Sequence, residues 1–547
     1  LHQAAVMADK DLYRGSVVRH RRRPDWYVTP QAWLPEVAAV PAVNLGAGNS
    51  LEVHLTHLPL LVRQHPEVAA LLPVADMTAR GQLDEECRQL GFVPRLHQHS
   101  GAEFARSRRG TLIADQMRLG KTLCALLAHD PAVGPLVVVA PLAARGVWID
   151  WFRRRWPDEE PAVLKGKTFV PEAVADKRII FTHYDILPAW QTSFSDTRIG
   201  TLVLDEAHVL SNSRTKRTQA VFLLGARAER VIALTGTPLW NRPYDLWAIL
   251  AILNPGAWGS HYDFGQRYCD PILGTHGTSY LGTSHEEEFR TRLAEVMIRR
   301  TWMDVRVDAP PSSRTVEIAD ITEAQAYRLE VLAEKVRDFS KARVHAGDLA
   351  RFRRLLGTLK SGAAADAALR VLDGGEPVVV WAWHRDVAYR IAQELADRGH
   401  VAYTITGDDD QPLREATIDA WRGCSVAALV VTISVGQVAI DLSHARQAVF
   451  AEVDFTPTTI AQAEMRIFST ARPMAITYIV VDHTVDRALV GALCKKCEVA
   501  ETLGVPAAET AIDVIAGAFG MRPEAADLNR LMCAFVQDYA GSEDDDS

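Results

Sequence analysis

Short, nearly continuous apolar runs alternate with helix-length segments from about residue 91 onward. One group of runs begins at residue 111 and continues at 136–141, 178–184, 201–208 and 231–238, and a second group lies at 376–383, 427–434, 447–453 and 475–481. Strands that are apolar on both faces and alternate with helices are typical of a parallel sheet covered on both sides. The pattern therefore predicts two α/β lobes, one after the other along the chain.

The remaining stretches lack this alternation. Residues 1–90 are irregular and rich in proline, and we expect a small N-terminal accessory region there, with the basic run 19–23 beside Trp26 interpreted as a solvated arm in preference to a DNA contact. Helices and loops are expected at 240–305, which completes a first lobe at 91–305. A helical linker is expected at 306–370, with the Ala/Gly-rich end 361–370 as a joint. A second lobe at 371–500 and a C-terminal helical tail with an acidic end at 501–547 complete the predicted organisation.

Composition narrows the class of protein. A chain of 547 residues exceeds what one hydrophobic core normally supports, which agrees with two lobes. No apolar stretch approaches the ~20 residues that cross a bilayer, so no membrane association is expected. The N-terminus lacks a signal-peptide pattern and the seven cysteines lack framework spacing, so a cytosolic location is expected. The excess of arginine and alanine suggests a bacterial or phage genome. The net charge of −8 still allows a local basic channel for nucleic acid.

A candidate phosphate loop follows the first strand. Gly120, Lys121 and Thr122 stand between an apolar run and a helix. Backbone N–H groups at a helix start favour a polyphosphate, Lys121 would reach the β- and γ-phosphates, and the Thr122 hydroxyl would ligate Mg²⁺. These three residues alone are a weak signal, because they also occur at ordinary helix starts.

A carboxylate pair ends another strand. Asp205 and Glu206 lie in "TLVLDEAH", where the first carboxylate can hold Mg²⁺ and the second can polarise the attacking water. Such a pair can also simply begin a helix. Because the loop and the pair each follow a strand in the same chain, together they predict a lobe that hydrolyses a nucleotide.

Further segments resemble the Swi/Snf-related branch of the superfamily 2 helicase-type ATPases, and most closely its annealing-helicase (HARP-like) subgroup. The resemblance covers roughly residues 91–500 in the family's order. Its segments are "PRLHQHSGAEFA" (94–105), "GTLIADQMRLGKT" (110–122), "LVVVAPLAARGVWIDWFRRRWP" (136–157), "LTGTPLWNRPYDLWAILAILNP" (234–255), "DFGQRYCD" (263–270), "VMIRRTWMDV" (296–305) and "AVFAEVDFTPTTIAQAEMRIFSTARP" (448–473).

The resemblance implies two tandem RecA-like lobes with parallel sheets and helical protrusions, which bind ATP and Mg²⁺ between them and move along DNA as the cleft opens and closes. It also implies roles for individual residues. These are Gln98 on adenine, Gly120, Lys121 and Thr122 on phosphates and Mg²⁺, Asp205 on Mg²⁺, Glu206 as general base, Gly436 in the glycine-rich turn of lobe two, and Arg466, with Arg472 as a second candidate, as arginine finger.

The sequence departs from the family at several of these positions. Arg118 replaces a loop glycine and Gln116 replaces an acid, so Arg118 either adds a cation to the phosphates or crowds them if the glycine conformation is required. Ser469 stands where a second arginine is expected, and Arg472, three residues further on, would substitute if the helix turns suitably. Gln437 and Ala439 replace glycines near Gly436. These changes raise the alternative of a slow or impaired ATPase.

Other candidates are weaker. Cys494 and Cys497 form one isolated Cys-x-x-Cys, for which a helix surface or core role is favoured over zinc. His208 is interpreted as a coupling residue of the carboxylate motif. Trp148, Trp151 and Trp156 are interpreted as core in preference to base-stacking residues, and the basic run 351–356 as a solvated helix face.

The predicted function is an ATP-dependent translocase on double-stranded or branched DNA, which rewinds or remodels it and serves DNA repair. Contacts to phosphate would make binding salt-sensitive and independent of sequence. The alternatives are a helicase that separates strands, for which no pin is visible in the sequence, and a degenerate ATPase that serves as a scaffold for DNA or a partner. Stripping proteins from DNA is a third possibility, and the sequence names no target or oligomeric state.

Overall fold

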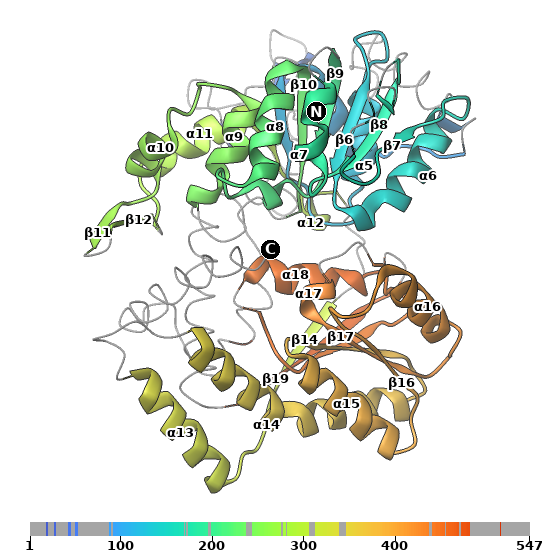
Figure 1. Cartoon of the computed structure of the whole chain (residues 1–547), viewed down its shortest axis with the longest axis vertical. Coiled ribbons are helices and arrows are strands. Elements are labelled where there is room, and N and C mark those ends of the chain that lie inside the picture. The colour runs from blue at the N-terminus through green and yellow to red at the C-terminus, as the bar shows by residue number, and fades with distance from the viewer. Residues whose placement is uncertain are drawn as a thin grey trace. The chain divides into compact units, whose positions relative to one another are not determined.

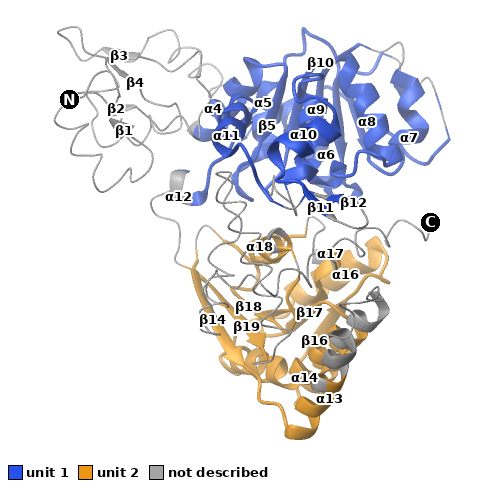
Figure 2. Cartoon of the chain, turned by 90° about the vertical axis from the view of Figure 1, so that its left-hand side faces the viewer, with its two compact units in different colours: residues 1–308, 502–505 blue, residues 309–501, 506–547 orange. Residues whose placement is uncertain are grey.

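The structure is a computed structural model that describes residues 91–481, except 169, 171–172, 175, 195–197, 237–242, 275–276, 281, 306–311, 338–345, 437–439, 455 and 470–471. It also describes short pieces at 18–19, 27–28, 42–44, 50–52 and 87–88, and residue 515. Two compact units meet in sequence between Asp308 and Ala309 (Figure 2). Most of the basic run 19–23, the Cys494–Cys497 pair, Gln437, Ala439 and the acidic tail lie outside the described residues.

Unit 1 is built on a seven-stranded parallel sheet with the strand order β13-β5-β10-β9-β6-β8-β7 (Figure 1). Its strands are β5 (Gly110–Ile113), β6 (Leu136–Ala140), β7 (Ala162–Val163), β8 (Ile179–His183), β9 (Ile199–Leu204), β10 (Ala228–Leu234) and β13 (Met297–Ile298). The central strands are buried on both faces, as their uninterrupted apolar runs predict.

Helices cover both faces of this sheet. On one face α4 (Leu96–Arg106), α5 (Lys121–Ala128) and α6 (Arg145–Arg155) share a core with alternate residues of the strands. Figure 2 shows α7 (Leu187–Trp190) and α8 (Lys216–Arg227) on the other side, and α9 (Trp247–Leu253) packs against α8 and β10. The predicted first α/β lobe is therefore confirmed.

A protrusion follows α9 and contains more than the helices and loops expected at 240–305. Its elements are α10 (His261–Tyr268), β11 (Ile272–Gly274), β12 (Gly277–Ser279), α11 (Glu286–Val296) and α12 (Trp302–Val305). The strands β11 and β12 pair as an antiparallel hairpin that projects beyond α10 (Figure 1). The sequence did not reveal this hairpin, because its strands are three residues long and β12 is "GTS", which contains no apolar side chain.

Unit 2 contains a six-stranded parallel sheet with the order β14-β19-β18-β15-β17-β16. Its strands are β14 (Ser312–Ile318), β15 (Val378–Ala382), β16 (Ala402–Ile405), β17 (Ala428–Thr432), β18 (Gln447–Phe450) and β19 (Met474–Val480). Its helices are α13 (Glu323–Arg337), α14 (Ala346–Asp373), α15 (Arg385–Asp397), α16 (Gln411–Arg422), α17 (Ile433–Gly436) and α18 (Pro457–Arg466). The second predicted α/β lobe is confirmed.

The stretch 306–370 differs from the helical linker and joint that we expected. Strand β14 pairs with β19 along its whole length, so this stretch contributes an edge strand to the second sheet. Ala364, Ala365 and Ala368 of α14 are fully buried in the core that α14 and α15 form with the sheet. Small side chains there allow a helix to pack closely on the strands, and the alanine-rich run is core, not a joint.

Within the part of the chain that the structure describes, no helix is long and apolar enough to span a bilayer.

Candidate nucleotide-binding site

The phosphate loop predicted from the sequence joins β5 to α5. Gly120 precedes the first helical residue, Lys121, with a φ of +87°. A Cβ atom at Gly120 would lie 2.1 Å from Nε2 of Gln98, so a side chain is excluded both by the backbone conformation and by the space. The loop is therefore closed against α4, which carries Gln98.

Arg118 has a φ of +64°, in the left-handed region that a glycine adopts easily. Its side chain is exposed. The arginine thus occupies a backbone conformation that a glycine would adopt without strain. A non-glycine residue in this region costs about 1–2 kcal/mol, so the arginine strains the loop.

Lys121 lies partly exposed at the start of α5, and its ammonium donates a hydrogen bond to the carbonyl oxygen of Asp115 at 2.9 Å. Burial lowers the pKa of Lys121, while the carboxylates of Glu206, Asp115 and Asp205 act in the opposite direction. The structure therefore brings the predicted phosphate-binding cation close to the predicted strand-terminal carboxylates. Thr122, the next residue, is also partly exposed.

The segment "LTGTP" lies against the phosphate loop. Gly236 follows β10, the strand beside β5, and a Cβ atom there would lie 2.6 Å from Cγ of Met117 and 3.5 Å from Nζ of Lys121. The backbone at Gly236 therefore touches the phosphate loop, which only a glycine permits without displacing Met117. Residues 237–242 of this segment lie outside the described residues.

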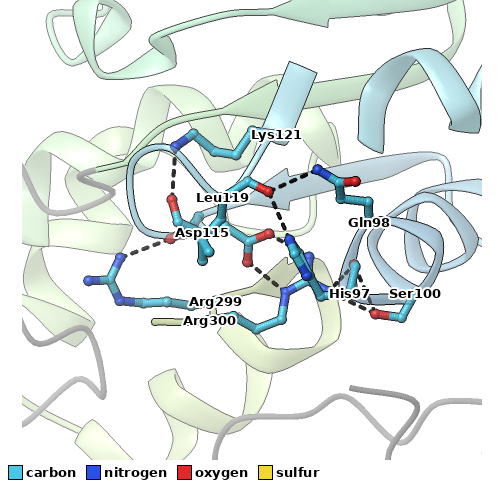
Figure 3. Close-up of polar contacts among 9 residues, drawn as sticks. His97, Gln98, Ser100, Asp115, Leu119, Lys121, Arg299 and Arg300 are labelled. Carbon is cyan, nitrogen blue, oxygen red and sulfur yellow. Dashed lines mark hydrogen bonds and ion pairs between the residues drawn. The ribbon is translucent and has the colours of Figure 1, made fainter. Parts of the chain in front are cut away.

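A buried ion pair between Arg300 and Asp115 supports the phosphate loop. Nε of Arg300 donates to Oδ1 of Asp115 at 2.8 Å, and a second guanidinium nitrogen donates to the other carboxylate oxygen (Figure 3). Arg300 also donates to the Ser100 hydroxyl at 2.7 Å and to the His97 carbonyl. Arg299 donates to the Ala114 carbonyl at 2.8 Å. Because Arg300 joins β13 to both α4 and the loop, it holds the three elements together.

Gln116 and Trp302 form a second brace. The Trp302 amide donates to Oε1 of Gln116 at 2.8 Å, and the Trp302 indole N–H donates to the Met117 carbonyl at 3.0 Å. The backbone N–H of Gln116 donates a hydrogen bond to the backbone carbonyl of Arg300. This contact needs an acceptor oxygen but no charge, which explains physically why a glutamine can stand where the family has an acid.

His97 and Gln98 connect α4 to the loop through one atom. Nε2 of His97 and Nε2 of Gln98 both donate to the Leu119 carbonyl, at 2.8 and 3.1 Å (Figure 3). Oε1 of Gln98 accepts from the Arg95 amide at 2.8 Å. Burial lowers the pKa of His97 to about 4, so the ring is neutral and carries its proton on Nε2. The role of Gln98 on adenine stays a prediction, and its carboxamide positions the loop in this structure.

Asp205 follows β9 and is held by two aromatic side chains. The Trp148 indole N–H donates to Oδ2 of Asp205 at 2.8 Å, and the Tyr184 hydroxyl donates to its backbone carbonyl at 2.7 Å. Burial, and then the adjacent Glu206 carboxylate, raise the pKa of Asp205 to about 6. The site therefore places two carboxylates side by side in a partly buried position, where a cation would stabilise their charged forms.

Glu206 has a φ of +48°, and its carboxylate Oε2 lies 3.3 Å from Nδ1 of His208. The same nitrogen lies 3.4 Å from the Thr235 hydroxyl, at the end of β10. His208 thus connects the carboxylate motif to the "LTGTP" segment. Within the described residues, no group of three or more His, Cys, Asp or Glu side chains is placed to hold a metal ion.

Several of these residues were not identified from the sequence as part of the site. Arg299, Arg300, Asp115 and Trp302 lie in segments that were recognised only by resemblance, and Arg300 and Asp115 are 185 residues apart. The available signal was a pair of arginines directly after a buried strand, where a charge needs a partner. Trp148 is fully buried, and Trp151 and Trp156 pack against the same core, so their interpretation as core residues is confirmed.

In unit 2 the arginine-finger candidates are separate. Arg466 is the last residue of α18, and its carbonyl accepts from the Leu442 amide at 3.0 Å. Ser469 and Arg472 lie beyond the helix, and Arg472 is exposed two residues before β19. Helix α18 ends before Arg472, so the two arginines do not share one helix, and the role of Arg472 stays a prediction. Gly436 ends the short helix α17 after β17.

The basic run 351–356 does not form a wholly solvated helix face. Arg353 donates to the Val453 carbonyl at 3.0 Å and stacks over Trp383. Nε of Arg354 donates to Asp386 at 2.7 Å, although both of these side chains are largely exposed. Part of the run is therefore used within unit 2.

A parallel-sheet unit with a phosphate loop and a strand-terminal carboxylate pair, followed by a second parallel-sheet unit, defines a helicase-type ATPase. The chain belongs to the SNF2-related family: the SNF2-related domain matches residues 56–361, and a helicase conserved C-terminal domain matches residues 363–470. The membership agrees with the predicted resemblance.

Among curated relatives, SWI/SNF-related matrix-associated actin-dependent regulator of chromatin subfamily A-like protein 1 of Xenopus tropicalis is 28% identical over 448 residues, which cover 80% of this chain and 48% of the relative. The DNA annealing helicase and endonuclease ZRANB3 of Homo sapiens is 24% identical over 426 residues, which cover 74% of this chain and 39% of that protein. The chain thus spans about half the length of these relatives or less. A solved SWI2/SNF2 ATPase core of Sulfolobus solfataricus in complex with double-stranded DNA is 22% identical with a TM-score of 0.35, and the match covers 80% of this chain and 96% of that one.

Proposed function

We propose that the chain is an ATP-dependent translocase on double-stranded DNA that rewinds or remodels branched DNA. The observation that carries the proposal is that the loop ending at Lys121 and the Asp205–Glu206 pair follow strands β5 and β9 of one parallel sheet, in a member of the SNF2-related family. Annealing activity is named for one relative, and it enters here as part of the proposal.

The residues present suit ATP with Mg²⁺. The start of α5 offers backbone N–H groups behind a loop in which Gly120 and Gly236 leave no room for side chains. Lys121 and Thr122 would bind the phosphates, and Thr122 with Asp205 would hold the metal ion. Mg²⁺ usually keeps several waters and takes one or two carboxylates plus the phosphates of the substrate, so a site with few protein ligands suits it. When bound, Mg²⁺ supplies charge neutralisation at the phosphates.

The chain's own residues would perform the remaining steps. Glu206 would accept a proton from the attacking water, and His208 lies 3.3 Å from its carboxylate and 3.4 Å from the Thr235 hydroxyl. Trp148 and Tyr184 orient Asp205. Arg466 would stabilise the charge that develops on the transferred phosphoryl group. These roles are proposals that rest on the positions of the side chains and on the family.

Phosphate release in the presence of duplex, single-stranded and forked DNA tests the proposal. We expect stimulation by duplex or forked DNA in the wild type, its loss in Lys121→Ala, and a steep decrease of DNA binding with salt. Equal near-zero rates in wild type and Lys121→Ala would instead favour the scaffold alternative. Assays of triplex displacement and strand displacement then separate translocation from strand separation. A cytosolic location in a bacterial or phage-infected cell stays a prediction.

A further inference from the structure

A ladder of stacked aromatic rings lies on unit 1, outside the nucleotide site. Trp247 stacks on His261 at 4.6 Å, His261 on Tyr244 at 3.8 Å, and Tyr244 on Tyr280 at 4.5 Å, with interplanar angles of 12°, 17° and 11°. The ring of Phe222 packs against that of Trp247 at 6.0 Å between centroids, with an interplanar angle of 48°. Core aromatic rings usually meet at an offset or edge-on, as around Trp258 in the same unit. Four nearly parallel rings therefore form an unusual ordered platform.

Hydrogen bonds and close contacts fix the ladder at both ends. The Trp247 indole N–H donates to the Gly259 carbonyl at 3.1 Å, and Gln266 donates to the Tyr280 hydroxyl at 2.9 Å. Gly265 of α10 admits the rings, because a Cβ atom there would lie 2.6 Å from Tyr244 and 2.8 Å from Tyr280. The platform is therefore rigid before any ligand arrives, which reduces the entropy cost of binding.

The ladder lines an open pocket of about 580 Å³. Its walls also include Ser213, Arg214, Gln219, Tyr262 and Thr278, so polar groups and one cation surround the rings. Tyr262 is 63% exposed, which leaves its ring free to close over a flat ligand. Lys216, in the first turn of α8, is exposed two residues after Arg214. Within the ladder the ring faces cover one another, so the exposed ring of Tyr262 is the surface on which a nucleobase can stack, with Arg214 beside it for the phosphate.

The hairpin β11–β12 borders the pocket. Thr278 of β12 lines it, and Leu273 is the direct cross-strand partner of Thr278, so the two side chains share one face of the hairpin. Leu273 is 85% exposed and Ile272 is 58% exposed. Apolar side chains displayed to this degree suit the face of a terminal base pair.

We propose that this aromatic pocket binds an unpaired nucleobase at a branch point in DNA, with Arg214 on the adjoining phosphate and the hairpin against the last base pair. The proposal rests on the proposed DNA translocase function and extends it to the choice of DNA structure. Ser213 and Arg214 follow the Asp205–Glu206 motif within ten residues, so the pocket wall and the carboxylates belong to one connection after β9. No pin is visible in the sequence, and the hairpin β11–β12 is a candidate for one.

The test uses the full chain without nucleotide, so its outcome does not depend on ATP hydrolysis. Forked DNA carries 2-aminopurine at the first unpaired position, and a fully paired duplex with the same base serves as reference. We expect stacking to quench the fluorescence on the fork, and we expect the fork-over-duplex binding ratio to fall about tenfold in Tyr262→Ala combined with Arg214→Ala. Tyr327→Ala and Arg227→Ala, which remove an exposed tyrosine and an exposed arginine elsewhere, should leave the ratio unchanged.

Photocrosslinking gives a second readout that does not require a variant to fold. With 5-iodouracil at the unpaired position, the crosslinked peptide should contain residues that line the pocket, within 213–222 or 244–280. Crosslinks confined to other segments, or a wild type without quenching and without fork preference, would overturn the inference and leave the pocket to another occupant such as a side chain of a protein partner. The absence of duplex-stimulated ATP hydrolysis in the wild type would refute the proposed function, and this outcome is distinct from a failure of the pocket proposal.

Discussion

The Arg300 guanidinium donates two hydrogen bonds to the Asp115 carboxylate in the interior of unit 1, where the arginine is 3% exposed and the aspartate is fully buried. The pair connects the segment after β13 to the base of the phosphate loop. Buried ion pairs contribute little net stability compared with apolar residues, but removal of one partner leaves an uncompensated charge. The pair therefore matters less as a source of stability than as a device that fixes the loop in one place.

We expect Arg300→Met to lower the free energy of unfolding by about 3–5 kcal/mol, because the Asp115 carboxylate would remain buried without its cation. The double variant Arg300→Met, Asp115→Leu should recover much of this loss. Urea unfolding measures both. Arg198→Ala provides the control, because its partner Glu229 is 42% exposed and such surface pairs are worth less than about 1 kcal/mol. A loss of similar size in both single variants would contradict the argument.

The strained loop residue yields a second prediction. Arg118→Gly should raise the free energy of unfolding by up to about 1 kcal/mol, because the left-handed φ of +64° no longer strains a side chain. Arg118→Ala keeps the Cβ atom and therefore the strain, while it removes the charge. Because the side chain is exposed, we expect both variants to bind ATP within about twofold of wild type. Isothermal titration with ATP and Mg²⁺ checks this, and a joint loss of affinity would assign the guanidinium to the phosphates.

The sequence predicted the parts of the fold that have a local signal. Runs such as 136–140 are apolar at every position because both faces of the strand are covered, and each became a strand. Strand β14 was missed because it lies at the edge of its sheet, where the exposed polar residues Ser312, Ser313 and Thr315 interrupt the apolar pattern. The alanines of α14 were misinterpreted because small residues suit a flexible joint as well as a closely packed helix.

The site shows the same division. Lys121 was found because it begins the helix that follows a strand and a short loop, and Asp205 because it directly follows a strand, whereas Arg300 and Asp115 pair across 185 residues with no local pattern. The contact of Gln98 with the loop carbonyl of Leu119 was also beyond reach, because the sequence does not say which way a side chain turns from its helix.

Two buried histidines predict how unit 1 responds to acid. Burial lowers the pKa of His129, which bonds the Thr201 hydroxyl at 3.0 Å, to about 4, as it does for His97. In each case the unfolded state binds the proton more readily, so stability is full above pH ~6.5 and falls as pH drops toward 4. The titration of each histidine should lower the free energy of unfolding by up to about 2 kcal/mol when the pH falls from 7.5 to 5.

Comparison of wild type with His129→Gln isolates this contribution in urea unfolding at the two pH values. The variant should lose less stability on acidification, by up to about 2 kcal/mol. Asp205 acts in the opposite direction, because its raised pKa means that the folded state takes up the proton first, and this contribution is common to both proteins. An equal acid sensitivity of wild type and variant would show that His129 does not titrate as its burial requires.

The last prediction concerns the helix that carries Arg466. Glu464 of α18 is buried, and its carboxylate accepts from Arg314 of β14 at 2.7 and 2.8 Å and from the Tyr478 hydroxyl of β19 at 2.6 Å. These bonds fix the end of the helix on two neighbouring strands. If Arg466 stabilises the transition state of ATP hydrolysis, loosening this anchor should lower kcat and leave the KM for ATP nearly unchanged.

Tyr478→Phe tests this with the smallest change, since it removes one hydroxyl and keeps the ring. We expect a loss of about 2 kcal/mol in unfolding free energy, because the hydroxyl bonds a charged acceptor in a buried position, and a several-fold fall in DNA-stimulated kcat. Tyr403→Phe removes a hydroxyl from β16, at the opposite edge of the same sheet, and should change neither kinetic constant. A rise in KM with unchanged kcat, or the same kinetic loss in both variants, would show that the Glu464 network stabilises unit 2 without positioning Arg466.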